Sequence, residues 1–185
     1  MRIIAGEKKS RKIEAPEGVD TRPTADRIKE ALFSILQRRL YDARVLDLYA
    51  GSGALSLEAL SRGAGSAQLV DKSYKACRII DKNIKTLDYE EKASLINMED
   101  KRAVELLENQ GKSFDLIFLD PPYRMDMTEM MDRLSRKLLA ADGMIVCEHD
   151  RSTPPGVPAS LVLQDRREYG ITGLSFYVRQ EEEDE

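Results

Sequence analysis

The stretch that decides the fold runs Phe114-Asp115-Leu116-Ile117-Phe118-Leu119-Asp120-Pro121-Pro122-Tyr123. Its first six residues are mostly apolar without helical spacing, and they end at a double proline, which predicts a strand buried on both faces. A strand of this kind is typical of an open parallel α/β sheet, in which ligands bind in the crevice at the carboxyl edge. The strand would deliver Asp120 to that edge.

The residues after this predicted strand form a stiff, polar turn. Two prolines lack backbone donors and hold φ near about −65°, so the turn is rigid and its carbonyls are free to accept hydrogen bonds. Asp120 adds a side-chain acceptor, and Tyr123 adds a flat ring. Rigid acceptors beside an aromatic face suit a planar base that carries an exocyclic amine. Taken alone, the turn is equally compatible with a strand end that has no function.

From Arg44 onward, strand and helix patterns alternate along the chain. We expect strands over residues 45–48, 67–70, 94–97, 115–119 and 144–147, with helices that begin near Ala54, Ser73, Lys101 and Thr128. Such alternation implies right-handed parallel crossovers and a doubly wound sheet. Two further strands, 161–169 and 174–179, have no helix between them and should form an antiparallel edge hairpin. The predicted fold class is α/β, with a mostly parallel, twisted, seven-stranded Rossmann-like sheet.

The amino-terminal part has a different pattern. Residues 2–5 and 11–14 predict a short β-hairpin around a turn at 6–10. A helix should follow, with Thr24 as its N-cap and Asp26 in its first turn. Its apolar face would comprise Ile28, Ala31, Leu32, Ile35 and Leu36.

Length and composition indicate one globular domain. The chain has 185 residues, of which 42% are hydrophobic and 34% charged, and we expect a single domain over 1–180. Within it, 1–43 form the amino-terminal extension and 44–180 the Rossmann-like core, while the acidic residues 181–185 are expected to be a disordered tail. Neither a membrane-spanning run nor a secretory leader is evident, so we expect a cytoplasmic protein without a membrane partner. We also expect a monomer. Two cysteines and one histidine argue against a metal site.

The distribution of charge indicates a nucleic-acid partner despite a formal net charge of −4. The last five residues are all acidic, whereas Lys8, Lys9, Arg11 and Lys12 are clustered near the amino terminus. Clustered lysine and arginine contact phosphates, which predicts an RNA-binding patch here. The further basic residues expected to contact RNA are Arg22, Arg27 and Lys29. A solvated hairpin tip is the alternative interpretation of the cluster.

A glycine-rich turn follows the first predicted core strand, in the stretch Val45-Leu46-Asp47-Leu48-Tyr49-Ala50-Gly51-Ser52-Gly53-Ala54-Leu55-Ser56. A strand, a glycine turn and a helix in this order form a nucleotide-type cradle. An NAD-binding turn would have a third glycine where Ser56 stands, and Asp47 would repel a pyrophosphate.

S-adenosylmethionine suits the same residues better. Its ammonium and sulfonium would favour Asp47, and its ribose hydroxyls would meet Asp71 after the second strand. Its adenine amine would meet Glu99 or Asp100, a choice that the sequence leaves open. The remaining predicted cofactor contacts are Tyr49, Ala50, Gly51, Ser52 and Gly53.

Taken together, these motifs resemble the bacterial 16S rRNA (guanine-N2)-methyltransferases, the RsmD family. The matching segments are Arg2-Ile3-Ile4-Ala5-Gly6, Thr21-Arg22-Pro23-Thr24 with Asp26, Arg27 and Lys29, Asp47 to Leu55, Leu119 to Tyr123, Cys147-Glu148-His149-Asp150 and Tyr169-Gly170. The resemblance implies a class I methyltransferase fold, S-adenosylmethionine as methyl donor, and a guanine of 16S rRNA in an assembling small ribosomal subunit as acceptor. Two departures are Ser10, where the family often has glycine, and Met98-Glu99-Asp100, which replaces a commoner Asp-Ala pair.

The same residues suggest a mechanism of amine methylation. Asp120 and the carbonyl of Pro121 would accept hydrogen bonds from the guanine amine, Pro122 would stiffen the turn, and Tyr123 would stack on the base. His149 could lie near the base and take a proton, or it could be a hydrogen-bonded structural residue between Glu148 and Asp150, which is the interpretation that we favour. Three other functions remain open: another amino-methyltransferase acting on DNA adenine or a protein amide, a non-catalytic RNA-binding assembly factor, and, least favoured, an NAD-dependent oxidoreductase.

Overall fold

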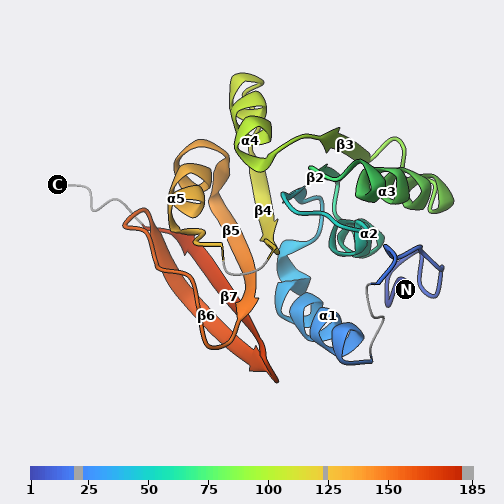
Figure 1. Ribbon diagram of the computed structural model, residues 1–185, viewed down its shortest axis with the longest axis horizontal. Helices are drawn as coiled ribbons and strands as arrows, with labels where there is room; N and C mark the ends of the chain where they lie inside the picture. Colours follow the sequence, from blue (N-terminus) through green and yellow to red (C-terminus); the bar gives the residue numbers. More distant parts are fainter. Residues whose placement is uncertain (19–22, 123–124, 181–185) are drawn as a thin grey trace.

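The chain folds around one mixed sheet in the computed structural model, which describes residues 1–18, 23–122 and 125–180 (Figure 1). Within these residues the sheet has seven strands in the order β3-β2-β1-β4-β5-β7-β6. The strands are β1 Arg44–Asp47, β2 Ser66–Asp71, β3 Ala93–Asn97, β4 Phe114–Leu119, β5 Leu139–Asp150, β6 Leu161–Tyr169 and β7 Thr172–Arg179. β1 to β5 pair in parallel, and β7 is antiparallel to both β5 and β6. The predicted α/β fold with an antiparallel edge hairpin is confirmed.

Helices cover both faces of this sheet (Figure 1). They are α1 Pro23–Leu36, the 3-10 turn η1 Gln37–Arg39, α2 Ala54–Ser61, α3 Tyr74–Thr86, α4 Asp100–Asn109 and α5 Thr128–Lys137. Side chains of α1, α2 and α3 pack in one core, and those of α4 and α5 pack in a second core. Alternate residues of β4 supply both, since Phe118 lies in the first core and Ile117 in the second. No described helix is long and apolar enough to cross a membrane.

Helix α1 differs from the prediction in its start and in its buried face. It begins at Pro23, so Thr24 lies inside the first turn rather than at the N-cap. Proline suits this first position because the amide hydrogen that it lacks would have no partner within the helix. Phe33 is fully buried and contacts the ring of Phe118 edge-on at 6.0 Å between centroids, whereas Ile35 is 38% exposed. The helix is therefore rotated toward Phe33 relative to the predicted face.

The longest strand is β5, which was predicted only over residues 144–147. It starts at Leu139, which pairs with Phe114 of β4, and it continues to Asp150, which pairs with Thr172 of β7. The antiparallel partner β7 provides hydrogen bonds along the polar end of β5, and this long-range pairing has no signal in the local sequence.

The amino-terminal segment pairs as a short antiparallel hairpin, although it is assigned only one bridge among the described residues, between Arg2 and Lys12. The N–H of Ile3 donates to the carbonyl of Arg11 at 2.9 Å, and the N–H of Ile13 donates to the carbonyl of Met1 at 3.0 Å. The residues that follow Ile3 are held by α2. The buried carboxylate of Glu58 accepts from the N–H groups of Ile4 at 2.9 Å and Ala5 at 3.0 Å. A Cβ on Gly6 would lie 1.9 Å from the Ser61 carbonyl oxygen, so only glycine allows this close approach.

Glu58→Gln should strongly destabilise the protein. The carboxylate also pairs with Lys29 at 3.5 Å and with Arg62 at 2.9 Å, and Lys29 is itself buried. Removing the negative charge leaves a buried cation unpaired, so the free energy of unfolding should fall by about 3 kcal/mol. Urea denaturation measures this loss. The control is Glu30→Gln on the exposed side of α1. A loss no larger than that of the control would show that Glu58 does not anchor the segment.

Candidate active site

A cavity of about 1180 Å³ lies at the carboxyl edge of the sheet. The first half of the cavity lies at the ends of β1, β2 and β3. The second half lies at the ends of β4 and β5, next to the turn between β6 and β7. Parallel pairing from β1 to β5 brings these strand ends to one edge. A pocket for one ligand commonly measures about 300–1,000 Å³, so this cavity is larger than most single-ligand pockets.

The glycine turn after β1 lies in the first half of the cavity. Gly53 has φ of 81° directly before α2, a left-handed conformation that disfavours side chains. The N–H of Gly51 donates to Oδ2 of Asp71 at 2.9 Å, and the N–H of Ser73 donates to Oδ1 of Asp71 at 2.8 Å. Asp71 therefore supports the turn, and each of its oxygens keeps a lone pair for a ligand hydroxyl.

Asp47 is buried beneath this turn with only one oxygen satisfied. Its Oδ2 accepts from the hydroxyl of Ser56 at 3.1 Å, whereas its Oδ1 has no hydrogen-bond partner among the described residues. Burial raises the pKa of Asp47 to about 7. The hydrogen bond from Ser56 lowers this pKa, whereas the negative charges of Asp120 and Asp71 raise it. A buried carboxylate oxygen in this state requires a donor or a cation.

The two adenine candidates after β3 differ in their existing contacts. Asp100 accepts from the Tyr49 hydroxyl at 2.7 Å and from the N–H of Lys101 at 2.7 Å. Glu99 is exposed to the cavity and has no side-chain partner in the part of the chain that the structure describes. The structure therefore favours Glu99 for contact with a ligand.

Some of the predicted cofactor residues line the cavity, and the others lie behind its lining. Tyr49, Gly51, Asp71, Glu99 and Asp100 line it. The rest of the predicted set, Asp47, Ala50, Ser52 and Gly53, lies outside the lining, around the turn itself.

The proline turn after β4 lies in the second half of the cavity. Asp120, Pro121 and Pro122 all line it, and Tyr123 falls outside the described residues. The Asp120 side chain is exposed to the cavity, although protein surrounds it on most sides. This enclosure raises the pKa of Asp120, an effect that solvent in an open cavity moderates.

Sequence reasoning missed Glu148 as a site residue. It lies near the end of β5, half-buried, and lines the same half of the cavity as Asp120. Burial raises its pKa, and the neighbouring charge of Asp120 raises it further. A signal was present, since Glu148 directly follows the predicted strand 144–147 just as Asp120 follows 115–119.

His149 has the contacts of a structural residue. Its Nδ1 lies 2.8 Å from the carbonyl oxygen of Asp150, which can only accept, so Nδ1 carries the proton. Its Nε2 then accepts from the hydroxyl of Ser175 at 2.7 Å, and that hydroxyl oxygen accepts from Arg166 at 2.9 Å. Both ring nitrogens are thus engaged, which agrees with the interpretation favoured from the sequence.

The basic residues predicted to contact RNA do not form one exposed patch. Lys29 is wrongly predicted, because it is 7% exposed, pairs with Glu58 and donates to the carbonyl of Arg2 at 3.2 Å. Lys8 lies 3.5 Å from Asp88 and Arg11 donates to the carbonyl of Thr86, so both are partly engaged. The residues that remain exposed, without an ion pair to another described residue, are Lys9, Lys12 and Arg27, while Arg22 lies outside the described residues.

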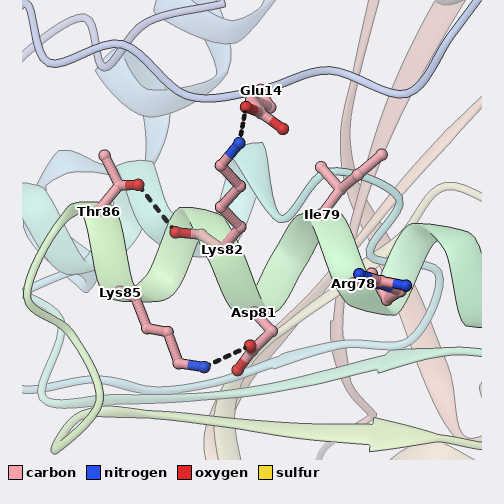
Figure 2. Close-up of a pocket in the computed structure, with 7 residues that line it drawn as sticks. All are labelled: Glu14, Arg78, Ile79, Asp81, Lys82, Lys85 and Thr86. Atoms are coloured by element: carbon pink, nitrogen blue, oxygen red, sulfur yellow. Dashed lines mark hydrogen bonds and ion pairs between the residues drawn. The ribbon is translucent and has the colours of Figure 1, made fainter.

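The amino-terminal segment also contacts α3 beside a shallow groove of about 550 Å³. Figure 2 shows Lys82 of α3 paired with Glu14, and Lys85 paired with Asp81 on the same helix. The Lys82–Glu14 pair and the two hydrogen bonds between Asn83 and the backbone of Glu14 fix the segment on α3, so Lys9 and Lys12 lie on a supported surface rather than on a free arm.

Comparison with known proteins gives the family. The profile of a family described as conserved hypothetical protein 95, the RsmD family, matches residues 1–178. The chain belongs to the RsmD family. It is 34% identical over 183 residues to ribosomal RNA small subunit methyltransferase D of Escherichia coli, covering 97% of this chain and 90% of that protein. It is also 38% identical over 180 residues to YlbH of Bacillus subtilis, covering 96% and 98% of the two chains.

A solved structure of yhhF from Escherichia coli has the same fold as this RsmD-family chain. The TM-score is 0.84 at 32% identity, and the match covers 98% of this chain and 99% of the other. Methyltransferases of this family and fold indicate S-adenosylmethionine as the methyl donor. The residues fit this cofactor chemically: the carboxylate of Asp71 lines the cavity and would accept from ribose hydroxyls, and Asp47, buried beneath the glycine turn, has an unpartnered Oδ1 that would favour a nearby ammonium.

Proposed function

We propose that this chain transfers a methyl group from S-adenosylmethionine to the exocyclic N2 amine of a guanine in 16S rRNA. The observation that carries the proposal is the shared cavity, in which the Asp120-Pro121-Pro122 turn lies beside the glycine-turn half. The names of the relatives support an rRNA acceptor, since they include a small-subunit rRNA methyltransferase.

The residues of the proline turn would align the amine. Bound S-adenosylmethionine supplies an electrophilic methyl group on its sulfonium. A guanine amine is a poor nucleophile, because its lone pair is delocalised into the ring. Asp120 would accept one amine hydrogen and the Pro121 carbonyl the other, which turns the lone pair toward the methyl group. The Asp120 carboxylate would also stabilise the positive charge that develops on nitrogen and accept the proton that it loses.

The proposed substrate contacts extend from the cavity to the basic amino-terminal surface. Lys9, Lys12 and Arg27 would contact phosphates, supported by the partly engaged Lys8 and Arg11. An unpaired rRNA base is cheaper to flip into the cavity than a paired one, which suits a loop in an assembling small subunit. Action as a monomer in the cytoplasm belongs to the same proposal.

Charge reversal at Lys9 and Lys12 should weaken the enzyme through RNA binding alone. The double variant Lys9→Glu, Lys12→Glu should lower kcat/KM for rRNA by about tenfold or more at low salt, because each lost phosphate contact removes counterion-release energy. Affinity for S-adenosylmethionine should not change. The matched control is Lys112→Glu, Lys137→Glu, two exposed lysines that precede β4 and β5 at the opposite edge of the sheet. Equal losses in the two double variants would argue against a specific RNA surface at the amino terminus.

The experiment that tests the function is methyl transfer to 16S rRNA and to small-subunit particles, followed by nucleoside analysis. N2-methylguanosine would support the proposal. Methylated DNA adenine or a methylated protein amide would instead support another amino-methyltransferase with the same turn.

A further inference from the structure

Two carboxylates lie side by side in the second half of the cavity. Leu119, the last residue of β4, pairs with Cys147 of β5, so Asp120 directly after β4 and Glu148 on β5 are the next residues of the two adjacent segments. Two residues earlier, Phe118 and Val146 pack in the same core, and strand alternation therefore places Asp120 and Glu148 on one face of the sheet. Both residues line the cavity.

No described residue neutralises this pair. Neither Asp120 nor Glu148 forms an ion pair or a side-chain hydrogen bond within residues 1–18, 23–122 and 125–180. His149, the neighbouring lining residue, has both ring nitrogens engaged elsewhere. Two adjacent carboxylates repel each other and are costly to enclose unless donors meet them. Their position in a substrate cavity indicates that the donors come from the substrate.

Guanine provides donors in the required arrangement. Its Watson–Crick edge carries the N2 amine and, on the adjacent ring atom, an N1–H. Adenine has an unprotonated acceptor at N1, which would face a carboxylate lone pair and be repelled. An ionised carboxylate only accepts hydrogen bonds, so it favours a base with an N1–H over one without it.

We propose that Glu148 selects guanine by accepting a hydrogen bond from N1–H while Asp120 and the Pro121 carbonyl hold the N2 amine. The assignment rests on the function proposed above and adds the residue that chooses the base. Glu148 thus determines specificity, and Asp120 acts on the reacting amine. The donors of the base also favour the charged carboxylates, which opposes the effect of burial on their pKa values.

The test replaces the target guanine of a 16S rRNA fragment, or of a reconstituted particle, with 2-aminopurine. This base keeps the amine at C2, but its N1 is an acceptor. Wild-type protein should therefore methylate guanine with a kcat/KM at least tenfold higher than that for 2-aminopurine. In Glu148→Gln the side-chain amide can donate to the N1 of 2-aminopurine, so this preference should shrink at least tenfold.

A binding readout accompanies the kinetics. RNA that contains 2-aminopurine is fluorescent, so its binding can be titrated without methyl donor and in competition with guanine RNA. The affinity for 2-aminopurine RNA relative to guanine RNA should be higher for Glu148→Gln than for wild type. Asp126→Asn is the matched control, because it removes a carboxylate that lines the same cavity but bonds Thr128, and it should leave the base preference unchanged. Glu148→Ala is the second variant, and it should lose activity on guanine without gaining any on 2-aminopurine.

An unchanged base preference in Glu148→Gln, with N2-methylguanosine still formed by wild type, would overturn the assignment of Glu148 alone. Absence of N2-methylguanosine from wild type on every RNA would overturn the proposed function, and the assignment with it. A base preference that shrinks equally in Asp126→Asn would also overturn the assignment, because the effect would then come from the net charge of the cavity and not from Glu148.

Discussion

Asp120→Asn should lower kcat for methyl transfer by about 100- to 1,000-fold while leaving the affinity for S-adenosylmethionine within about threefold of the wild-type value. The amide keeps the size of the side chain but no longer compensates the charge that develops on the amine nitrogen. It also cannot accept the proton that this nitrogen loses. Single-turnover methyl transfer gives the rate, and calorimetric titration gives the cofactor affinity.

The control for this variant is Asp126→Asn. Asp126 lines the same cavity and accepts hydrogen bonds from the N–H and the hydroxyl of Thr128 at the start of α5, contacts that an asparagine oxygen can also accept. Its kcat should stay within about twofold of wild type. Near-normal methylation by a folded Asp120→Asn would show that the amine is aligned by other groups.

Asp47→Asn should separate cofactor binding from stability. Loss of the charge should raise the Kd for S-adenosylmethionine about 10- to 100-fold, since a hydrogen bond to a charged group contributes about 1.5–3 kcal/mol. The ligand-free protein should become more stable, because the variant removes a buried carboxylate whose Oδ1 has no partner among the described residues. Calorimetric titration and urea denaturation measure the two effects.

The stability gain from Asp47→Asn should depend on pH. The pKa of Asp47 is raised from 3.8 to about 7 in the folded protein, so the folded state retains a proton that the unfolded state has lost. Between these values the stability of wild type falls as pH rises, and the variant lacks this component. The stability difference should widen by about 2–3 kcal/mol from pH 5 to pH 8. Asp115→Asn, at the opposite end of a strand, is the control for cofactor affinity. Parallel pH profiles for Asp47→Asn and wild type would contradict the account.

The sequence predicted the sheet well because its signals are local. Apolar runs such as Leu116 to Leu119, glycine turns and prolines each constrain the backbone within a few residues. The same signals place Asp120 and Asp71 at strand ends, and parallel pairing brings those ends together. The glycine turn at Gly51 and Gly53 was predicted on the same grounds.

The parts that the sequence did not predict depend on distant partners. Lys29 has the spacing of an exposed helix residue, but Glu58 from α2 provides a buried partner for it. The amino-terminal hairpin pairs only as far as Ile3, and the N–H groups of Ile4 and Ala5 donate to Glu58 of α2 instead. The engagement of Asp100 by Tyr49 likewise joins two separate strand ends, and no spacing rule indicates it.

Methylation of a guanine amine in small-subunit rRNA is decided by the identity of the methylated nucleoside. Labelled methyl transfer from S-adenosylmethionine to naked 16S rRNA and to small-subunit particles, both from cells that lack this protein, should be followed by nucleoside analysis and mapping of the product. We predict N2-methylguanosine at a single site. Label recovered as another nucleoside, or no transfer to either acceptor by protein that binds S-adenosylmethionine, would contradict the account.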